Sequence, residues 1–153
     1  MKKLTGIENR VEELIGRCRA SGLRITQQRL EIFRELLNCS DHPDAEKLFQ
    51  RLRGKMPGLS LDTVYRTLWM LNDAGVITTM GFERDKTRFD GNIDHHHHFV
   101  CIKCGSISDF YSDTLDSLEI PESAKKLGKA CNAHVEIRGI CNNCSKVSDP
   151  SEI

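Results

Sequence analysis

The chain has 153 residues, of which 39% are hydrophobic and 29% are charged, and its formal net charge at pH 7 is zero. This balance is typical of a soluble globular protein and excludes a disordered polymer, and the length suits one ordinary domain or two small ones. No apolar run reaches the roughly 20 residues of a membrane span, and the N-terminus has no signal-peptide pattern. We therefore expect a cytoplasmic protein with no membrane partner.

The zero net charge conceals a difference between the two halves of the chain. Residues 1–88 contain 16 Lys and Arg against 12 Asp and Glu, a charge of +4, whereas residues 89–153 contain 6 against 10, a charge of −4. A basic half favours a polyanionic partner, and an acidic half favours the binding of cations. The excess is small enough to arise by chance, so the choice of partner for each half has to come from the local motifs.

Residues 1–89 predict a run of helices followed by a hairpin. Apolar side chains recur at helical spacing, and suitable N-terminal residues precede them. The predicted helices begin near these residues: Ile7, Thr26, Pro43 and Ser60. Two short strands are expected at 76–80 and 87–89. This order predicts a winged helix-turn-helix domain over residues 1–89.

In such a domain the helix that follows Ser60 would enter the major groove of DNA. Tyr65 and Arg66 are the leading candidates for base or phosphate contacts. Thr63, which lies outside the predicted apolar stripe of the same helix, is a further candidate for DNA contact. Further candidates for contact with the DNA backbone, including two in the wing, are Arg17, Arg19, Arg24, Arg29, Arg84 and Lys86. Each of these could equally be a solvated surface charge, because phosphate contacts are many and interchangeable.

The segment 90–94 is rich in turn-forming residues and predicts a hinge. Residues 95–153 form the second predicted domain, with strands at 98–102, 105–111 and 133–140. One or two helices, interrupted at Pro121, are expected between the second and third of these strands. The predicted fold class is therefore α+β, with two domains.

Four cysteines form two C-x-x-C pairs, Cys101 with Cys104 and Cys141 with Cys144, separated by 36 residues. Four thiolates can complete a tetrahedral zinc shell with bonds of about 2.3 Å. A shell of four protein ligands has no open position for a substrate, so the predicted zinc site is structural. Disulfides are disfavoured in the reducing cytoplasm.

A second group of ligands surrounds four consecutive histidines, His95 to His98. In a strand alternate residues share a face, so His96 and His98 would point one way and His95 and His97 the other. Asp90 and Asp109 flank the run and could join either pair. Such nitrogen and carboxylate ligands suit Fe(II), Mn(II), Zn(II) or Co(II).

The segment GLRIT at 22–26, the helical sequence DTVYRTL and the two C-x-x-C pairs together resemble the ferric uptake regulator (Fur) family of metal-dependent bacterial repressors. The resemblance covers nearly the whole chain. It implies an N-terminal winged helix and a C-terminal α/β dimerisation domain. It also implies a homodimer that binds double-stranded palindromic operator DNA when metal occupies a regulatory site.

The resemblance also assigns ligands to three sites. The structural Zn(2+) would be held by Cys101, Cys104, Cys141 and Cys144. The regulatory site, for Fe(2+) or Mn(2+) and possibly Zn(2+), would be formed by His42, Asp90, His96, His98 and Asp109. An auxiliary site found in some members would be formed by His95, His97, His134 and Asp116, with Asp113 as an alternative carboxylate.

Aspartate rather than glutamate at Asp90 and Asp109 is similar to the peroxide-sensing (PerR-like) branch of the family. In that branch bound ferrous iron reacts with hydrogen peroxide, a ligand histidine is oxidised, iron is lost and the repressor releases DNA. His42 or His96 would be the oxidised residue. The run of four histidines is more similar to the iron-sensing members, which leaves a ferrous-iron or zinc uptake regulator without peroxide sensing as the alternative.

Two other classes of protein agree less well with the sequence, a metallohydrolase and a structural zinc-ribbon protein. A metallohydrolase would need an open coordination position and a general base, and the sequence has no H-E-x-x-H motif. A purely structural zinc-ribbon protein would leave the DNA-binding helix and the histidine group unexplained. We therefore expect a transcriptional regulator and not an enzyme.

Overall fold

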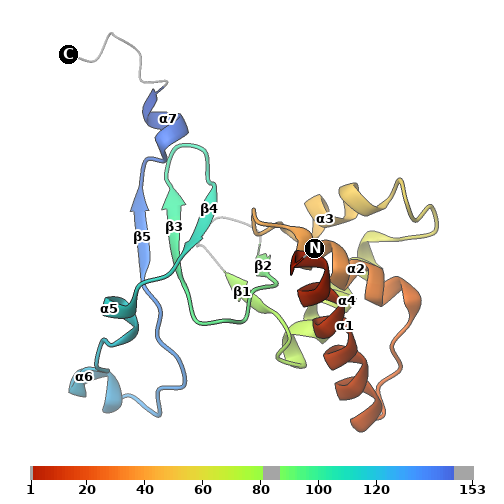
Figure 1. Ribbon diagram of the computed structural model, residues 1–153, viewed down its shortest axis with the longest axis horizontal. Helices are drawn as coiled ribbons and strands as arrows, with labels where there is room; N and C mark the ends of the chain where they lie inside the picture. Colours follow the sequence, from red (N-terminus) through yellow and green to blue (C-terminus); the bar gives the residue numbers. More distant parts are fainter. Residues whose placement is uncertain (1, 81–86, 147–153) are drawn as a thin grey trace. The chain divides into compact units, whose positions relative to one another are not determined.

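The structure is a computed structural model that describes residues 2–80 and 87–146 (Figure 1). The described residues form two compact units, a first unit that ends at Ile93 and a second unit that begins at Asp94. This boundary lies inside the segment in which the sequence predicts a hinge, and the hinge itself stays a prediction. No described helix is long and apolar enough to cross a membrane.

The described residues of the first unit form four helices and a two-stranded sheet. The elements are α1 (Lys2–Ala20), α2 (Gln27–Asn38), α3 (Ala45–Leu52), α4 (Leu61–Asp73), β1 (Thr78–Met80) and β2 (Arg88–Asp90). The two strands pair antiparallel, with Thr78 opposite Asp90. This is the order predicted for a winged helix. Asp90, expected in the connector between the domains, is the last residue of β2.

Side-chain caps fix where the helices of the first unit begin. Thr26 accepts the N–H of Arg29 at the start of α2, and Ser60 accepts the N–H of Thr63 at the start of α4, as the sequence predicts. The third helix begins later than predicted. Asp44 is its cap, accepting the N–H of Lys47, because a carboxylate satisfies a free helical N–H and proline cannot.

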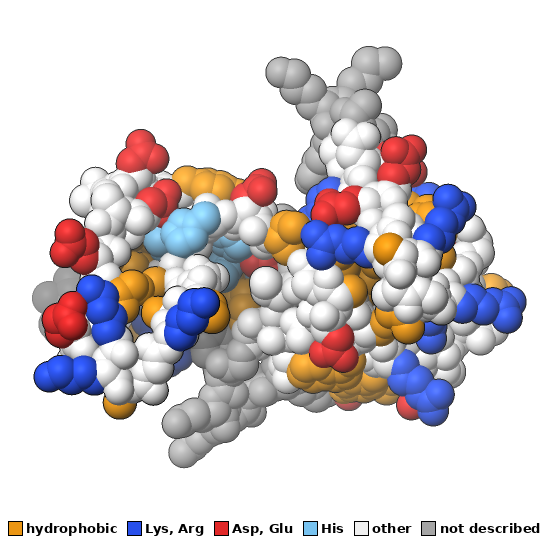
Figure 2. All heavy atoms as spheres, turned by 90° about the horizontal axis from the view of Figure 1, so that it is seen from below, with side chains coloured by type: hydrophobic (Ala, Val, Ile, Leu, Met, Phe, Trp, Pro, Cys, Tyr) orange, Lys and Arg blue, Asp and Glu red, His pale blue; other side chains and the backbone are white. Residues whose placement is uncertain are grey.

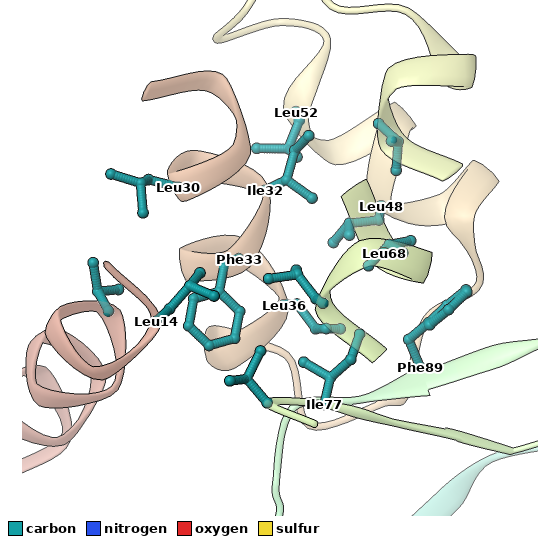
Figure 3. Close-up of a cluster of buried hydrophobic side chains, with 14 of the residues drawn as sticks. Leu14, Leu30, Ile32, Phe33, Leu36, Leu48, Leu52, Leu68, Ile77 and Phe89 are labelled. Carbon is teal, nitrogen blue, oxygen red and sulfur yellow. The ribbon is translucent and has the colours of Figure 1, made fainter. Parts of the chain in front are cut away.

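Apolar side chains from every helix and from β2 form the core of the first unit (Figure 3). Leu14, Phe33, Leu36, Leu68 and Phe89 are each at most 1% exposed. Burial of one such side chain stabilises the fold by about 1.5–3 kcal/mol. Because Phe89 is part of this core, β2 is anchored to the helices immediately before Asp90.

The second unit is built on a three-stranded sheet with β3 (His97–Cys101) in the centre. β4 (Ile107–Phe110) pairs antiparallel with β3, and β5 (Glu136–Gly139) pairs parallel with it. Short helices α5 (Asp113–Asp116) and α6 (Glu122–Lys125) lie toward one end of the sheet, and α7 (Asn142–Lys146) lies at the other end (Figure 1). The predicted interruption at Pro121 is confirmed, whereas α7 is not predicted by the sequence.

Candidate metal centres

The four paired cysteines converge at one end of the three-stranded sheet. Cys101 and Cys104 flank the turn between β3 and β4, and Cys141 and Cys144 lie at the start of α7 and within it. All four Sγ atoms lie within 4.8 Å of one another. The Sγ atoms of Cys104 and Cys141 are 3.9 Å apart, close to the spacing of about 3.8 Å between thiolates on one tetrahedral zinc ion. The cluster therefore fits a zinc ion and contains no disulfide.

The surroundings of the sulfur atoms favour thiolates on one side of the cluster. Backbone N–H groups of Cys104 and Cys141 donate to Cys101 and lower its pKa to about 6. A hydrogen bond with Ser106 lowers the pKa of Cys104. Cys144 has its pKa raised to about 12, chiefly by its hydrogen bond with Cys141. A divalent cation would favour the deprotonated form of the remaining thiol.

A histidine–carboxylate group in the second unit is formed across β3 and β4. Asp109 lies opposite His98 in the register of the two strands. The Nε2 atoms of His96 and His98 are 2.9 Å apart. They lie 3.5 and 3.4 Å from Oδ1 of Asp109. Three ligand atoms at this spacing fit around one metal ion, and both histidines are buried.

His96 is also oriented by a backbone group, since its Nδ1 makes a hydrogen bond with the carbonyl oxygen of Asp94. A carbonyl accepts only, so Nδ1 carries the proton and Nε2 keeps its lone pair. This is the arrangement in which histidine binds a metal through Nε2.

The first unit contains a histidine–carboxylate pair of its own, His42 and Asp90. Nε2 of His42 lies 3.4 Å from Oδ2 of Asp90, and both side chains are 4% exposed. Arg88, two residues before Asp90 in β2, donates to the carbonyl oxygens of Asp41 and His42. Arg88 is not among the site residues predicted from the sequence. Its position two residues before Asp90 places both residues on one face of β2, but this spacing does not indicate the contact with His42.

A third group of ligands is formed by His95, His97 and Asp116. Oδ1 of Asp116 lies 3.0 Å from Nε2 of His95 and 2.9 Å from Nε2 of His97. The edge-to-face contacts of His95 with His97 and of His96 with His98 confirm the predicted alternation of the histidines. Figure 2 shows histidine side chains reaching the surface beside carboxylates.

His134 does not join the third group among the described residues. It lines the same cavity of about 350 Å³, but its ring lies next to that of His98, at a centroid distance of 5.8 Å. Asp113, the alternative carboxylate, starts α5 and is also outside the group. The structure thus brings three of the four predicted auxiliary ligands together, and His134 as the fourth ligand stays a prediction.

The candidate DNA-binding residues lie mainly on the surface of the first unit. Arg19, Arg24 and Arg66 are exposed, and Tyr65 is half-buried. Arg66 pairs with Asp62 across one turn of α4, at 2.9 Å. The hydroxyl group of Thr63 instead lies 2.8 Å from that of Ser60 at the helix cap. Arg84 and Lys86 lie outside the described residues.

The other two arginine candidates make contacts inside the first unit. Arg17 pairs with Glu13 and donates to the carbonyl oxygen of Ala74. Arg29 donates to the carbonyl oxygen of Arg24. Contact of any of these residues with DNA stays a prediction.

Comparison with known proteins gives one consistent family. Residues 20–138 match the family model described as the ferric uptake regulator family. The peroxide-responsive repressor PerR of Staphylococcus epidermidis is 34% identical over 144 residues, which are 94% of this chain and 96% of the relative.

Two solved structures show the same architecture. The Vibrio cholerae ferric uptake regulator is 32% identical, with a TM-score of 0.65 over 81% of this chain and 96% of the other. PerR of Streptococcus pyogenes is 31% identical, with a TM-score of 0.51 over 88% and 92%. The expected fold class, an N-terminal winged helix with a C-terminal α/β dimerisation domain, is confirmed.

Proposed function

The chain belongs to the ferric uptake regulator family, and from this premise we propose that it is a metal-dependent transcriptional repressor. It binds double-stranded operator DNA as a homodimer when its regulatory site holds a metal ion. Its metal sites serve binding and sensing and not the turnover of a substrate.

The observation that carries this proposal is the pair formed by His42 and Asp90. Two metal-ligating side chains are buried in the unit that also carries Tyr65 and Arg66, the leading candidates for DNA contact. Because both side chains are only 4% exposed, neither can contact DNA directly. The pair fits a role in sensing an ion.

Two protein ligands are few for a transition-metal ion, which prefers four to six. We therefore assign five ligands to one regulatory Fe(2+), Mn(2+) or Zn(2+) ion: His42, Asp90, His96, His98 and Asp109. The four-cysteine cluster holds a structural Zn(2+).

Ligands drawn from both units would restrict the angles that the DNA-binding unit can adopt. A palindromic operator demands one spacing between two such units, so the ion shifts the population toward the DNA-competent state. A coupling of about 1–3 kcal/mol changes operator affinity about 5- to 150-fold.

The finer part of the proposal is that peroxide is the signal. Ferrous iron, when bound, would supply the redox chemistry that cleaves the O–O bond of hydrogen peroxide. Peroxide is the two-electron oxidant: one of its oxygen atoms would be added to the imidazole of His42 or His96, and the other would leave as water. An oxidised ring is a poor ligand, so the site loses its ion and the protein releases DNA. The aspartates at positions 90 and 109 and the similarity to peroxide-responsive repressors support this reading.

The deciding experiment is mass spectrometry of the iron-loaded protein after dilute peroxide, with operator binding measured on the same sample. We expect one added oxygen atom on a peptide that contains His42 or His96, together with loss of binding. The manganese-loaded protein should stay unmodified, because Mn(2+) does not support this reaction under the same conditions.

The second candidate is a ferrous-iron or zinc uptake regulator without peroxide sensing. The run of four histidines and the similarity to the Vibrio cholerae ferric uptake regulator favour it. An unmodified protein that releases DNA only on chelation would support this candidate. A His42→Ala protein with unchanged metal dependence of operator binding would contradict the regulatory assignment in both.

A further inference from the structure

His42 has a left-handed backbone conformation, with φ of 50°. It is the single residue other than glycine with a positive φ in the described part of the chain. Side chains with a Cβ atom rarely adopt this conformation, and it persists where surrounding contacts impose it. The contacts that impose it on His42 therefore also decide where its imidazole lies.

Arg88 makes one of these contacts. Its Nε donates to the carbonyl oxygen of His42 at 2.6 Å, and its Nη2 donates to the carbonyl oxygen of Asp41 at 2.6 Å. The guanidinium group is planar and rigid, so its two N–H groups fix both carbonyl groups together. The N–H of Phe89 donates to the carbonyl oxygen of Pro43, which extends the attachment by one residue.

Arg88 is also connected to the second ligand of the pair. It lies two residues before Asp90 in β2, on the same face of the strand. Phe89 between them is fully buried, so this strand has little freedom to move. Through its side chain and its strand, Arg88 sets the separation of His42 and Asp90.

We propose that Arg88 is a positioning residue for the regulatory metal. It holds His42 in its left-handed conformation and so preorganises the His42–Asp90 pair before any ion binds. In this role the guanidinium group acts through the backbone carbonyl oxygens of Asp41 and His42, and it is not itself a ligand. The inference rests on the proposed function, because it assumes that His42 and Asp90 bind the regulatory ion.

The test compares Arg88→Met and Arg88→Lys with wild type, with Arg34→Met as the matched control. Arg34 also makes two attachments, but to the carboxylates of Glu8 and Glu31 on the surface of α1 and α2. Mn(2+) is the probe, because it is stable in air. We expect Arg88→Met to weaken Mn(2+) binding about 10- to 100-fold, the usual effect of losing a group that orients a ligand. The Mn(2+) affinity of Arg88→Lys should lie between those of Arg88→Met and wild type, since one ammonium group cannot reproduce the two fixed N–H donors of the guanidinium group. Arg34→Met should bind Mn(2+) as wild type does.

A second measurement uses the metal-free protein and does not depend on the ion. Amide hydrogen exchange at Phe89 should accelerate in Arg88→Met, because the segment that contains Pro43 is released, while exchange in α2 and α4 stays unchanged. Accelerated exchange throughout the first unit would instead show a general structural role and would overturn the proposal. If Arg88→Met does not fold, Arg88→Lys gives the same comparison.

The outcomes also separate this inference from the proposed function. If His42→Ala weakens Mn(2+) binding but Arg88→Met binds as wild type, only the role of Arg88 is wrong. If His42→Ala binds Mn(2+) as wild type, the regulatory assignment is wrong, and the positioning of a metal ligand by Arg88 is overturned with it. The exchange data would then report only on the attachment of the backbone segment.

Discussion

His97 and Asp116 are joined by a contact of 2.9 Å between Nε2 and Oδ1. The other ring nitrogen of His97, Nδ1, accepts the backbone N–H of Val135 at 3.0 Å. A neutral imidazole whose Nδ1 accepts carries its proton on Nε2, which here donates to the carboxylate. His96 has the opposite arrangement, with Nδ1 donating to the carbonyl oxygen of Asp94. Nε2 of His97 therefore carries a proton and donates to a carboxylate, whereas Nε2 of His96 has a lone pair that can bind a metal ion.

This difference predicts the order in which the histidines meet a metal. To bind through Nε2, His97 must move its proton to Nδ1 and break the contact with Val135. We therefore expect the group of His95, His97 and Asp116 to bind Mn(2+) more weakly than the group that contains His96. NMR of ¹⁵N-labelled, zinc-loaded protein should show the proton of His97 on Nε2 and that of His96 on Nδ1 before Mn(2+) is added.

The same sample then tests the order by titration. The first equivalent of Mn(2+) should broaden the signals of His96 and leave a separate, weaker step for His95 and His97. Asp116→Asn serves as the control, since it should abolish only the weaker step. A stronger step that disappears in this variant would contradict the order.

The cap of α4 predicts a change in stability. Ser60 is exposed and its Oγ accepts the N–H of Thr63 at 3.1 Å. Ser60→Ala removes this acceptor and should lower the free energy of unfolding by about 1 kcal/mol, as is usual for a lost N-cap. Ser60→Asp supplies another acceptor and should stay close to wild type. Urea denaturation followed by circular dichroism measures both, and an equal loss in the two variants would argue against the cap.

Much of the first unit could be predicted from the sequence because its signals are local. Thr26 and Ser60 cap helices through N–H groups only three residues away. Gly22 and Gly75 follow the last residues of α1 and α4 and have the positive φ that glycine commonly adopts at the C-terminal end of a helix. Spacing along the chain is enough for such features. The alternation of the histidines follows from the two-residue period of a strand in the same way.

Features that depend on distant segments could not be predicted in this way. The attachment of Arg88 to His42 joins residues 46 positions apart, and no sequence pattern near either residue predicts this contact. The ring of His134 lies next to that of His98, and the sequence could not place it because the irregular segment before β5 has no periodicity. The cysteines are the exception, because zinc chemistry demands that both C-x-x-C pairs meet.

Close packing around Gly91 predicts a destabilising substitution. A Cβ atom at this position would lie 3.2 Å from Cδ2 of Leu37 and 3.4 Å from the carbonyl oxygen of Leu36. Gly91→Ala should therefore lower the free energy of unfolding by about 1 kcal/mol or somewhat more. The strain should also disturb the adjacent Asp90.

The double variant Leu37→Ala/Gly91→Ala supplies the control for this prediction. Removing the side chain of Leu37 opens the space, so Gly91→Ala should cost less in this background than in wild type. A double-mutant cycle from denaturation curves gives the coupling directly. Additive effects would show that the contact with Leu37 does not limit the substitution.

The cysteine cluster predicts that zinc removal affects the two units differently. The second unit has a small sheet, and its cluster ties the turn between β3 and β4 to α7. The first unit has its own core, to which none of the four paired cysteines contributes. A strong chelator should therefore unfold the second unit while the helices of the first unit stay protected from hydrogen exchange. Protons compete with zinc for thiolates, so chelation should be faster at pH 5 than at pH 7.

Cys144→Ser and Cys131→Ser form a matched pair for this prediction. Cys131 is exposed and outside the cluster, so its replacement should leave zinc content and exchange unchanged. Cys144→Ser removes one of four ligands and should lower zinc affinity and the protection of β3 and β5, while α2 and α4 keep theirs. Loss of protection throughout both units in this variant would mean that the first unit depends on the zinc site for its stability, and that its hydrophobic core is insufficient alone.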